Sequence, residues 1–295
     1  MNKLPIEKRK QIVNLLVEGS SLRAISRICD VSINTVTKLL VDIGKACEKF
    51  HDEKVRNVTA SRIQADEIWS FVAMKEKTAT RLGIDEDGIG DVWTWTGIDA
   101  DTKLIISWYV GNRDAVSANE FMLDVASRLK NRVQLTTDGH KAYLKAVENA
   151  FDGEIDFAQL VKIYGNVEGS GNDRRYSPVE CIGSEKHIVE GRPDEKHIST
   201  SYVERQNLTM RMHMRRFTRL TNAFSKKVEN HAYAIALHFV YYNFCKVHKS
   251  LRVTPAMEAK LATRPMTIED ICNLAPIEAP KKRGPYKTKK TEGAE

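Results

Sequence analysis

The sequence predicts an α/β protein, in which a mixed sheet flanked by helices follows an all-helical N-terminal domain. In the first fifty residues, apolar side chains recur at the spacing of helices. From residue 62 onward, strand-like runs alternate with amphipathic segments in the order strand, hairpin, helix, strand and further helices. The 295 residues, of which 42% are hydrophobic, are enough for one large domain and one small domain.

Three helices are predicted in the N-terminal domain, which we place at residues 1–52. The first covers residues 4–19 and ends at a glycine, and the second covers residues 21–30. The third covers residues 32–50 and begins at Ser32, a residue type that caps helices by accepting a hydrogen bond from a free backbone N–H.

The second and third helices have the layout of a helix-turn-helix, whose second helix presents its first residues to the DNA major groove. The apolar positions expected to bury together are Leu22, Ile25, Ile28, Val31, Ile33, Val36 and Leu39. The positions left outward near the start of the third helix are Ser32, Asn34, Thr35 and Lys38. Short polar residues and a lysine there favour DNA binding over the alternative, a three-helix cap or dimerisation unit.

The second domain is predicted to span residues 60–260. Its strands are expected at residues 62–72, 91–100, 104–114 and 133–138, and its helices at residues 120–130, about 139–150, 201–221 and 227–247. Residues 151–198 are rich in glycine and charge and are predicted to form a loop-rich insertion. Residues 261–295 are predicted to be a basic, disordered tail that adds non-specific DNA affinity.

Two adjacent carboxylates, Asp66 and Glu67, interrupt the apolar run of the first strand. A bare carboxylate in an apolar interior is costly unless a cation or hydrogen bonds meet it. Either the strand is half-exposed and one acid faces water, or one of the acids holds a metal ion. The spacing does not decide which acid would do so, since both faces of a central strand can be buried.

Two further acids are candidates for the same site. Asp138 ends a predicted strand, where ligand-binding groups gather in open α/β sheets, although it could equally cap the next helix. Glu204 stands at the head of a basic stripe: residues 205–228 contain no acid and seven lysines and arginines. An acid that holds a cation, followed by arginines along a phosphate backbone, would explain that stripe. The arginines assigned to phosphate contacts are Arg205, Arg211, Arg215 and Arg216.

Three carboxylates gathered in this way suit phosphodiester chemistry. Hard divalent ions prefer oxygen ligands, and two Mg²⁺ ions, or Mn²⁺ as a substitute, can activate the attacking oxygen and stabilise the leaving one. The ions also remove the repulsion between neighbouring carboxylates. The predicted cofactor is therefore Mg²⁺ or Mn²⁺, held as two ions.

Composition points to the same class of partner. The net charge is +7 and the isoelectric point is about 9.0, which favours an anionic partner such as nucleic acid. The five cysteines form no CxxC pair, and the longest apolar run is too short to span a bilayer. We therefore expect a cytoplasmic, nucleoid-associated protein without a disulfide framework.

Three blocks of the sequence resemble the signature blocks of bacterial insertion-sequence DDE transposases, in particular the family founded by the first numbered insertion sequence. They are QADEIWSFV, TTDGHKAY and the long block from HISTSYVERQ to TPAMEA, in the family's order and within about residues 62–260. The resemblance implies a ribonuclease-H-like fold and a catalytic triad of Asp66, Asp138 and Glu204, and so favours Asp66 over Glu67. It also implies Mg²⁺-dependent cutting at terminal inverted repeats, followed by joining of the freed 3′-OH to target DNA.

Founding members of that family carry a cysteine-rich zinc finger before the helix-turn-helix, and this sequence contains none. Recognition of the element ends could therefore differ. Because two ends are cut together, a homodimer or larger assembly on double-stranded DNA is expected. The alternative functions are a domesticated, non-catalytic DNA-binding regulator and a structure-specific nuclease of the same fold.

Overall fold

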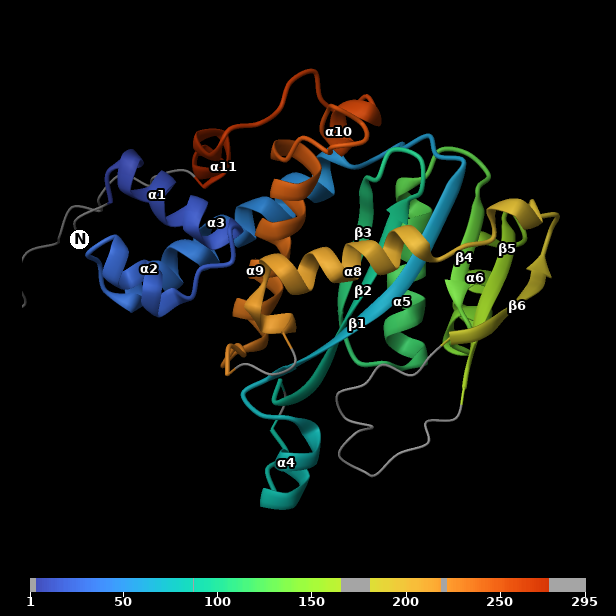
Figure 1. Ribbon diagram of the computed structural model, residues 1–295, viewed down its shortest axis with the longest axis horizontal. Coiled ribbons are helices and arrows are strands. Elements are labelled where there is room, and N and C mark those ends of the chain that lie inside the picture. The colour runs from blue at the N-terminus through green and yellow to red at the C-terminus, as the bar shows by residue number, and fades with distance from the viewer. Residues whose placement is uncertain (1–3, 87, 166–180, 219–221, 276–295) are drawn as a thin grey trace, which may run out of the picture.

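The computed structural model describes residues 4–86, 88–165, 181–218 and 222–275 (Figure 1). It is a mixed α/β structure with an N-terminal helical region, as the sequence predicts. The strands are β1 (Arg62–Val72), β2 (Gly90–Asp99), β3 (Ile105–Gly111), β4 (Gln134–Asp138), β5 (Asp156–Tyr164) and β6 (Cys181–Glu190). The main helices are α1 (Ile6–Val17), α2 (Leu22–Ile28), α3 (Ile33–Lys54), α4 (Glu76–Leu82), α5 (Ala115–Arg128), α6 (Ala142–Phe151), α8 (Ser201–His213), α9 (Val228–Val240), α10 (Pro255–Glu258) and α11 (Ile268–Leu274).

The six strands form one sheet in the order β3-β2-β1-β4-β5-β6. Strand β1 is antiparallel to β2 and parallel to β4, and β4 is parallel to β5, so the sheet is mixed. Helices α5 and α6 lie behind the sheet and α8 crosses in front of β1 (Figure 1). Both faces of β1 are therefore covered, which explains why this strand lacks a simple alternation of apolar and polar residues.

The N-terminal helices form around buried Ile12, Val13, Ile25 and Val36. The predicted cap of α3 is confirmed, because the Ser32 hydroxyl accepts a hydrogen bond from the backbone N–H of Asn34 at 3.1 Å.

Two residues predicted to be buried in this region are exposed: Ile28 is 57% and Ile33 is 40% accessible. Helix α2 has only seven residues, and it turns Ile25 and Cys29, one helical turn apart, toward the core. Ile28 lies off that face, and Ile33, the first residue of α3, precedes the buried part of its helix.

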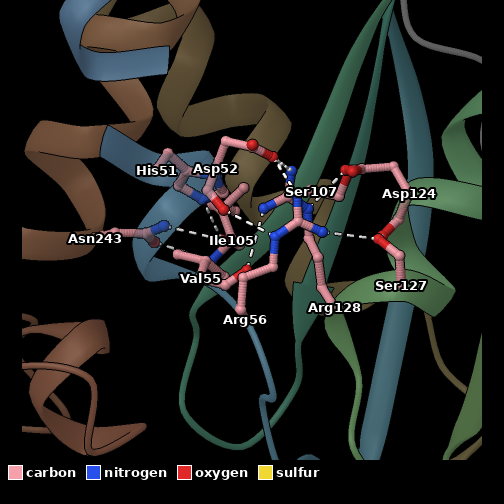
Figure 2. A network of polar contacts seen from close by, with 10 residues as sticks. All are labelled: His51, Asp52, Val55, Arg56, Ile105, Ser107, Asp124, Ser127, Arg128 and Asn243. Atoms are coloured by element: carbon pink, nitrogen blue, oxygen red, sulfur yellow. Dashed lines mark hydrogen bonds and ion pairs between the residues drawn. The ribbon is translucent and has the colours of Figure 1, made fainter. Parts of the chain in front are cut away.

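Helix α3 continues past the helical region and joins it to the sheet. It crosses α9 so closely that a Cβ added at Gly44 would lie 2.4 Å from Tyr233. At the C-terminal end of α3, Arg128 of α5 donates to the Val55 carbonyl oxygen at 3.1 Å and pairs with Asp52 at 2.9 Å (Figure 2). Hydrophobic packing is continuous from α1 to the sheet, so the helical region and the sheet share one core.

The C-terminal end of the described chain folds back onto the helical region. Helix α11 lies beside α1, and Arg9 of α1 donates hydrogen bonds to the carbonyl oxygens of Cys272 at 2.8 Å and Ala275 at 3.1 Å (Figure 1). The prediction of a disordered tail from residue 261 is therefore wrong up to residue 275. The strongly basic segment of that tail, residues 276–295, lies outside the described residues.

The loop-rich insertion predicted at residues 151–198 is also wrong for its described segments. Strands β5 and β6 form an antiparallel pair there and complete the edge of the sheet. Every residue of β6 is exposed, so the strand carries no apolar face that a sequence pattern could reveal. Residues 166–180 lie outside the described residues. Within the described ranges, every helix is too short or too polar to cross a lipid bilayer.

Candidate active site

The acidic residues of β1 and β4 meet because these strands are parallel neighbours. Ala65 pairs with Thr137, so the next residues along the two strands, Asp66 and Asp138, lie side by side at the end of the ladder. Carboxylate oxygens of Asp66, Glu67 and Asp138 all lie within 4.8 Å of one another. The structure thus brings two of the predicted site residues together and adds Glu67.

Asp66 and Glu67 make their contacts with different layers, as expected for successive residues of a strand. Asp66 accepts a hydrogen bond from the side-chain amide of Asn207 on α8, at 2.8 Å. Glu67 accepts one from Arg113 Nε at 3.0 Å and a long one from the Tyr143 hydroxyl of α6 at 3.4 Å. The Glu67 side chain is fully buried. The carboxylate of Glu67 is therefore already stabilised by hydrogen bonds from protein side chains.

Arg113 also links the two strands of the site. Its second guanidinium nitrogen lies 3.6 Å from Asp138 Oδ2, while Nε holds Glu67. The guanidinium stacks over the Trp93 ring, 4.8 Å from the ring centroid, which fixes its position. One cation thus compensates two of the three clustered acids.

The crowding of negative charge favours the protonated form of Asp66. Burial, followed by repulsion from Glu67 and Asp138, raises the pKa of Asp66 from 3.8 to about 8. Burial and the charge of Asp138 also raise the pKa of Glu67, against the opposing effect of Arg113. A divalent cation would relieve this repulsion.

The donor set fits a hard divalent cation such as Mg²⁺ or Mn²⁺. All three acids supply oxygen, the ligand atom that these ions prefer. Within the described chain, two buried polar side-chain atoms beside the acids also lack a hydrogen-bond partner: Asn207 Oδ1 and His140 Nε2. An ion with its water shell would satisfy such atoms.

Glu204 has a different environment from the other two predicted acids. It lies in the first turn of α8, where Lys162 Nζ of β5 contacts both carboxylate oxygens at 2.5 Å and the Thr200 hydroxyl donates at 2.5 Å. Glu204 is not a member of the three-carboxylate cluster. Asn207, one helical turn further along α8, nevertheless contacts Asp66 at 2.8 Å. Glu204 and Asp66 therefore face the same region.

The predicted DNA-contacting residues lie on α3, on α8 and in the segment that follows α8. On α3, Ser32, Asn34 and Lys38 are exposed and Thr35 is half-buried. Arg205, in the second turn of α8, and Arg215, beyond its end, are exposed, whereas Arg211 and Arg216 are half-buried.

Helix α8 ends at His213, eight residues earlier than predicted, and Arg215–Phe217 form a 3₁₀ turn, η2. The predicted helical stripe therefore breaks before Arg215. Met214 and Phe217 are both buried on either side of this break.

Three contacts of the site were not predicted. Lys162 lies on a strand that the sequence did not reveal, so nothing singled it out. Arg113 follows an edge strand as one of many surface-type arginines, and only the fold places it against Glu67. Asn207 gave the clearest signal, because it lies one helical turn from Glu204 on the same face.

Fold and site together define an α/β protein with a clustered acidic centre built from oxygen ligands. Residues 181–245 match the family model described as IS1 transposase. The expected resemblance is thereby confirmed over these residues, which contain Glu204 but neither Asp66 nor Asp138. No match was found among curated proteins.

Proposed function

We propose that the protein is a DNA transposase that binds the terminal inverted repeats of an insertion sequence and catalyses metal-dependent strand cleavage and strand transfer. The observation that carries the proposal is the meeting of Asp66 and Asp138 where the pairing of β1 with β4 ends, beside the helix that carries Glu204 within the matched IS1 transposase segment. The mixed sheet covered on both faces supports a ribonuclease-H-like catalytic domain.

The acids are proposed to hold two Mg²⁺ or Mn²⁺ ions, with Asp66 and Asp138 as ligands of the first and Glu204 completing the second site. When bound, such ions activate the attacking oxygen and stabilise the leaving oxygen of a phosphodiester. Asn207 orients Asp66 by donating to Oδ2, which leaves Oδ1 available as a ligand. Arg113 keeps Asp138 in place through its bond to the buried Glu67.

Lys162 has a specific consequence in this scheme. Its ammonium group neutralises Glu204 through both oxygens, so a cation at Glu204 must displace it. The displaced ammonium group would face the negatively charged DNA. Because of this ion pair, Glu204 is expected to bind its metal ion only when DNA is also present to accept the displaced Lys162 ammonium group.

DNA recognition is proposed for the helical region. Asn34 and Lys38 are exposed at the start of α3, where a recognition helix presents its first residues to base edges. Arg205, Arg211, Arg215 and Arg216 are proposed to contact phosphates. A homodimer or larger assembly is proposed because two ends must be cut together.

A cleavage and strand-transfer assay tests the proposal, using duplex DNA that carries the sequences flanking the coding region. Wild type would be compared with Glu204→Gln and with Glu195→Gln, an exposed acid of the same segment, in Mg²⁺, Mn²⁺ and EDTA. Metal-dependent products from wild type and Glu195→Gln, lost in Glu204→Gln with DNA binding retained, are expected. Specific binding without products in either metal would replace the enzyme with a DNA-binding regulator. Cutting of branched DNA without joining would instead indicate a nuclease.

A further inference from the structure

A cavity of about 1030 Å³ lies between the helical region and the C-terminal helices, away from the acidic site. Its walls are the α1–α2 turn, the start of α3, the segment from the end of α8 through η2, residues 222–226 and α9. These segments are distant in sequence and meet because α3 crosses α9. The cavity therefore forms only in the folded chain, between the proposed recognition helix and the helix that carries Glu204.

The lining of this cavity is positively charged. Arg23, Arg215, Arg216 and Lys226 line it, and its described lining includes no aspartate or glutamate. The protein as a whole carries 39 acidic and 46 basic residues, so a cavity wall with four cations and no acid departs from the mixture found elsewhere. A wall of this kind attracts a polyanion.

Arg216 is the most unusual of these cations. Burial lowers its pKa to about 10, and its guanidinium has one weak hydrogen bond, from Nη1 to the Asn230 carbonyl oxygen at 3.4 Å. Among the described residues it has no ion pair. Burial, and after it the Arg216 charge, lowers the pKa of its neighbour His231, which stays neutral. Arg216 is half-buried, and a partly desolvated cation without a counter-charge destabilises the free protein, so an external anion is the natural partner.

The position of the cavity indicates which anion. Asn34 and Thr37 of α3 line the same cavity as Arg216. A DNA backbone that flanks the major groove read by α3 would pass beside these residues. Arg216 follows α8 directly, so a phosphate bound here connects end recognition to the helix that carries Glu204.

We propose that this cavity binds the phosphodiester backbone of the same DNA segment that α3 recognises, with Arg216 and Lys226 as phosphate ligands. The inference rests on the proposed function, since it assigns a DNA-contacting site to the transposase. The helical region and the catalytic domain then form opposite walls of a single DNA site.

Fluorescence anisotropy with a labelled duplex, measured over a range of salt concentrations, tests the proposal together with the melting temperature of the DNA-free protein. The variants are Arg216→Met, Arg216→Lys, Lys226→Met and the control Lys227→Met. Lys227 is the exposed neighbour of Lys226 and does not line the cavity. Titration with pyrophosphate, read by thermal shift, determines whether free phosphate groups bind the same site.

Each cavity variant that loses a cation is expected to bind DNA about tenfold more weakly, because a hydrogen bond to a charged group is lost. The slope of log K against log[salt] should fall in magnitude by about 0.9 for each. Arg216→Lys should recover some of the affinity and Lys227→Met should match wild type. The melting temperature of DNA-free Arg216→Met should be equal to or above that of wild type, because a half-buried charge without a counter-charge is removed.

Three results would overturn the inference. Unchanged affinity and slope in Arg216→Met and Lys226→Met, with wild type binding and cutting DNA, would refute the cavity site alone. Equal losses in Lys226→Met and Lys227→Met would show non-specific surface charge. A pyrophosphate shift that Arg216→Met retains would place the anion elsewhere. Failure of wild type to bind any duplex would instead refute the proposed function.

Discussion

Acid should destabilise this protein through three buried histidines, His51, His231 and His238. Their exposed fractions are 2%, 0% and 5%, and burial lowers the pKa of each from the usual 6.5 to about 3. The charged groups that act on them are Arg128, Asp52 and Arg56 for His51, Arg216 for His231, and His213 and Lys246 for His238.

The sign of the effect follows from these lowered values. The folded protein keeps the three rings neutral, whereas the unfolded chain protonates them below pH 6.5. The stabilisation is therefore complete above about pH 6.5 and is lost as the pH falls toward 3. At pH 5 each ring lowers the unfolding free energy by about 2 kcal/mol relative to its value above pH 6.5, since one pKa unit corresponds to about 1.4 kcal/mol. The three rings together lower it by about 6 kcal/mol. Folded domains are typically stable by only about 5–15 kcal/mol.

Urea unfolding followed by tryptophan fluorescence at pH 7.5, 6 and 5 would measure this loss. His238→Leu is the informative variant, because within the described chain neither ring nitrogen of His238 has a hydrogen-bond partner to leave unpaired. The drop in unfolding free energy between pH 7.5 and 5 should shrink by about 2 kcal/mol in His238→Leu. It should be unchanged in His187→Gln, whose side chain is exposed. If His238→Leu retains the full drop, the ring is not kept neutral by burial and the reasoning fails.

Three further predictions concern the core, the acidic site and the junction. Gly44→Ala should lower the unfolding free energy by about 1–3 kcal/mol, because the added methyl overlaps Tyr233 on α9, and a chemical denaturation curve without a shift would contradict the close crossing. Lys162→Met should tighten Mn²⁺ binding about tenfold by removing the cation that competes for Glu204. Electron paramagnetic resonance titration reports free Mn²⁺, and weaker binding would show that Lys162 supports the metal site instead. Arg128→Met should cost about 1–3 kcal/mol, since the Val55 carbonyl oxygen and Asp124 lose the guanidinium as a donor while the half-exposed Asp52 keeps its ion pair with Arg56 in the junction of Figure 2; an unchanged urea midpoint would mean that the network is dispensable.

Local patterns were enough for the strands and helices that bury an apolar face. The limits of β1 coincide with the predicted residues 62–72, and Asp138 ends β4 as expected. The N-terminal helices were readable because apolar spacing and the Ser32 cap both act within a few residues. Strand β6 could not be read in the same way, since pairing with β5 at the sheet edge stabilises it without burying its side chains.

The sequence by itself determined that β1 carries two acids in an apolar strand and that an isolated acid heads a basic helix. Only the tertiary structure decided how those charges are compensated, because Arg113, Lys162 and Asn207 reach them from three elements distant in sequence. It also decided that α3 and η2 share a cavity around Arg216. Charge compensation and cavity formation depend on side chains brought within a few ångströms by packing. The residue pattern of a single strand or helix does not predict these distances.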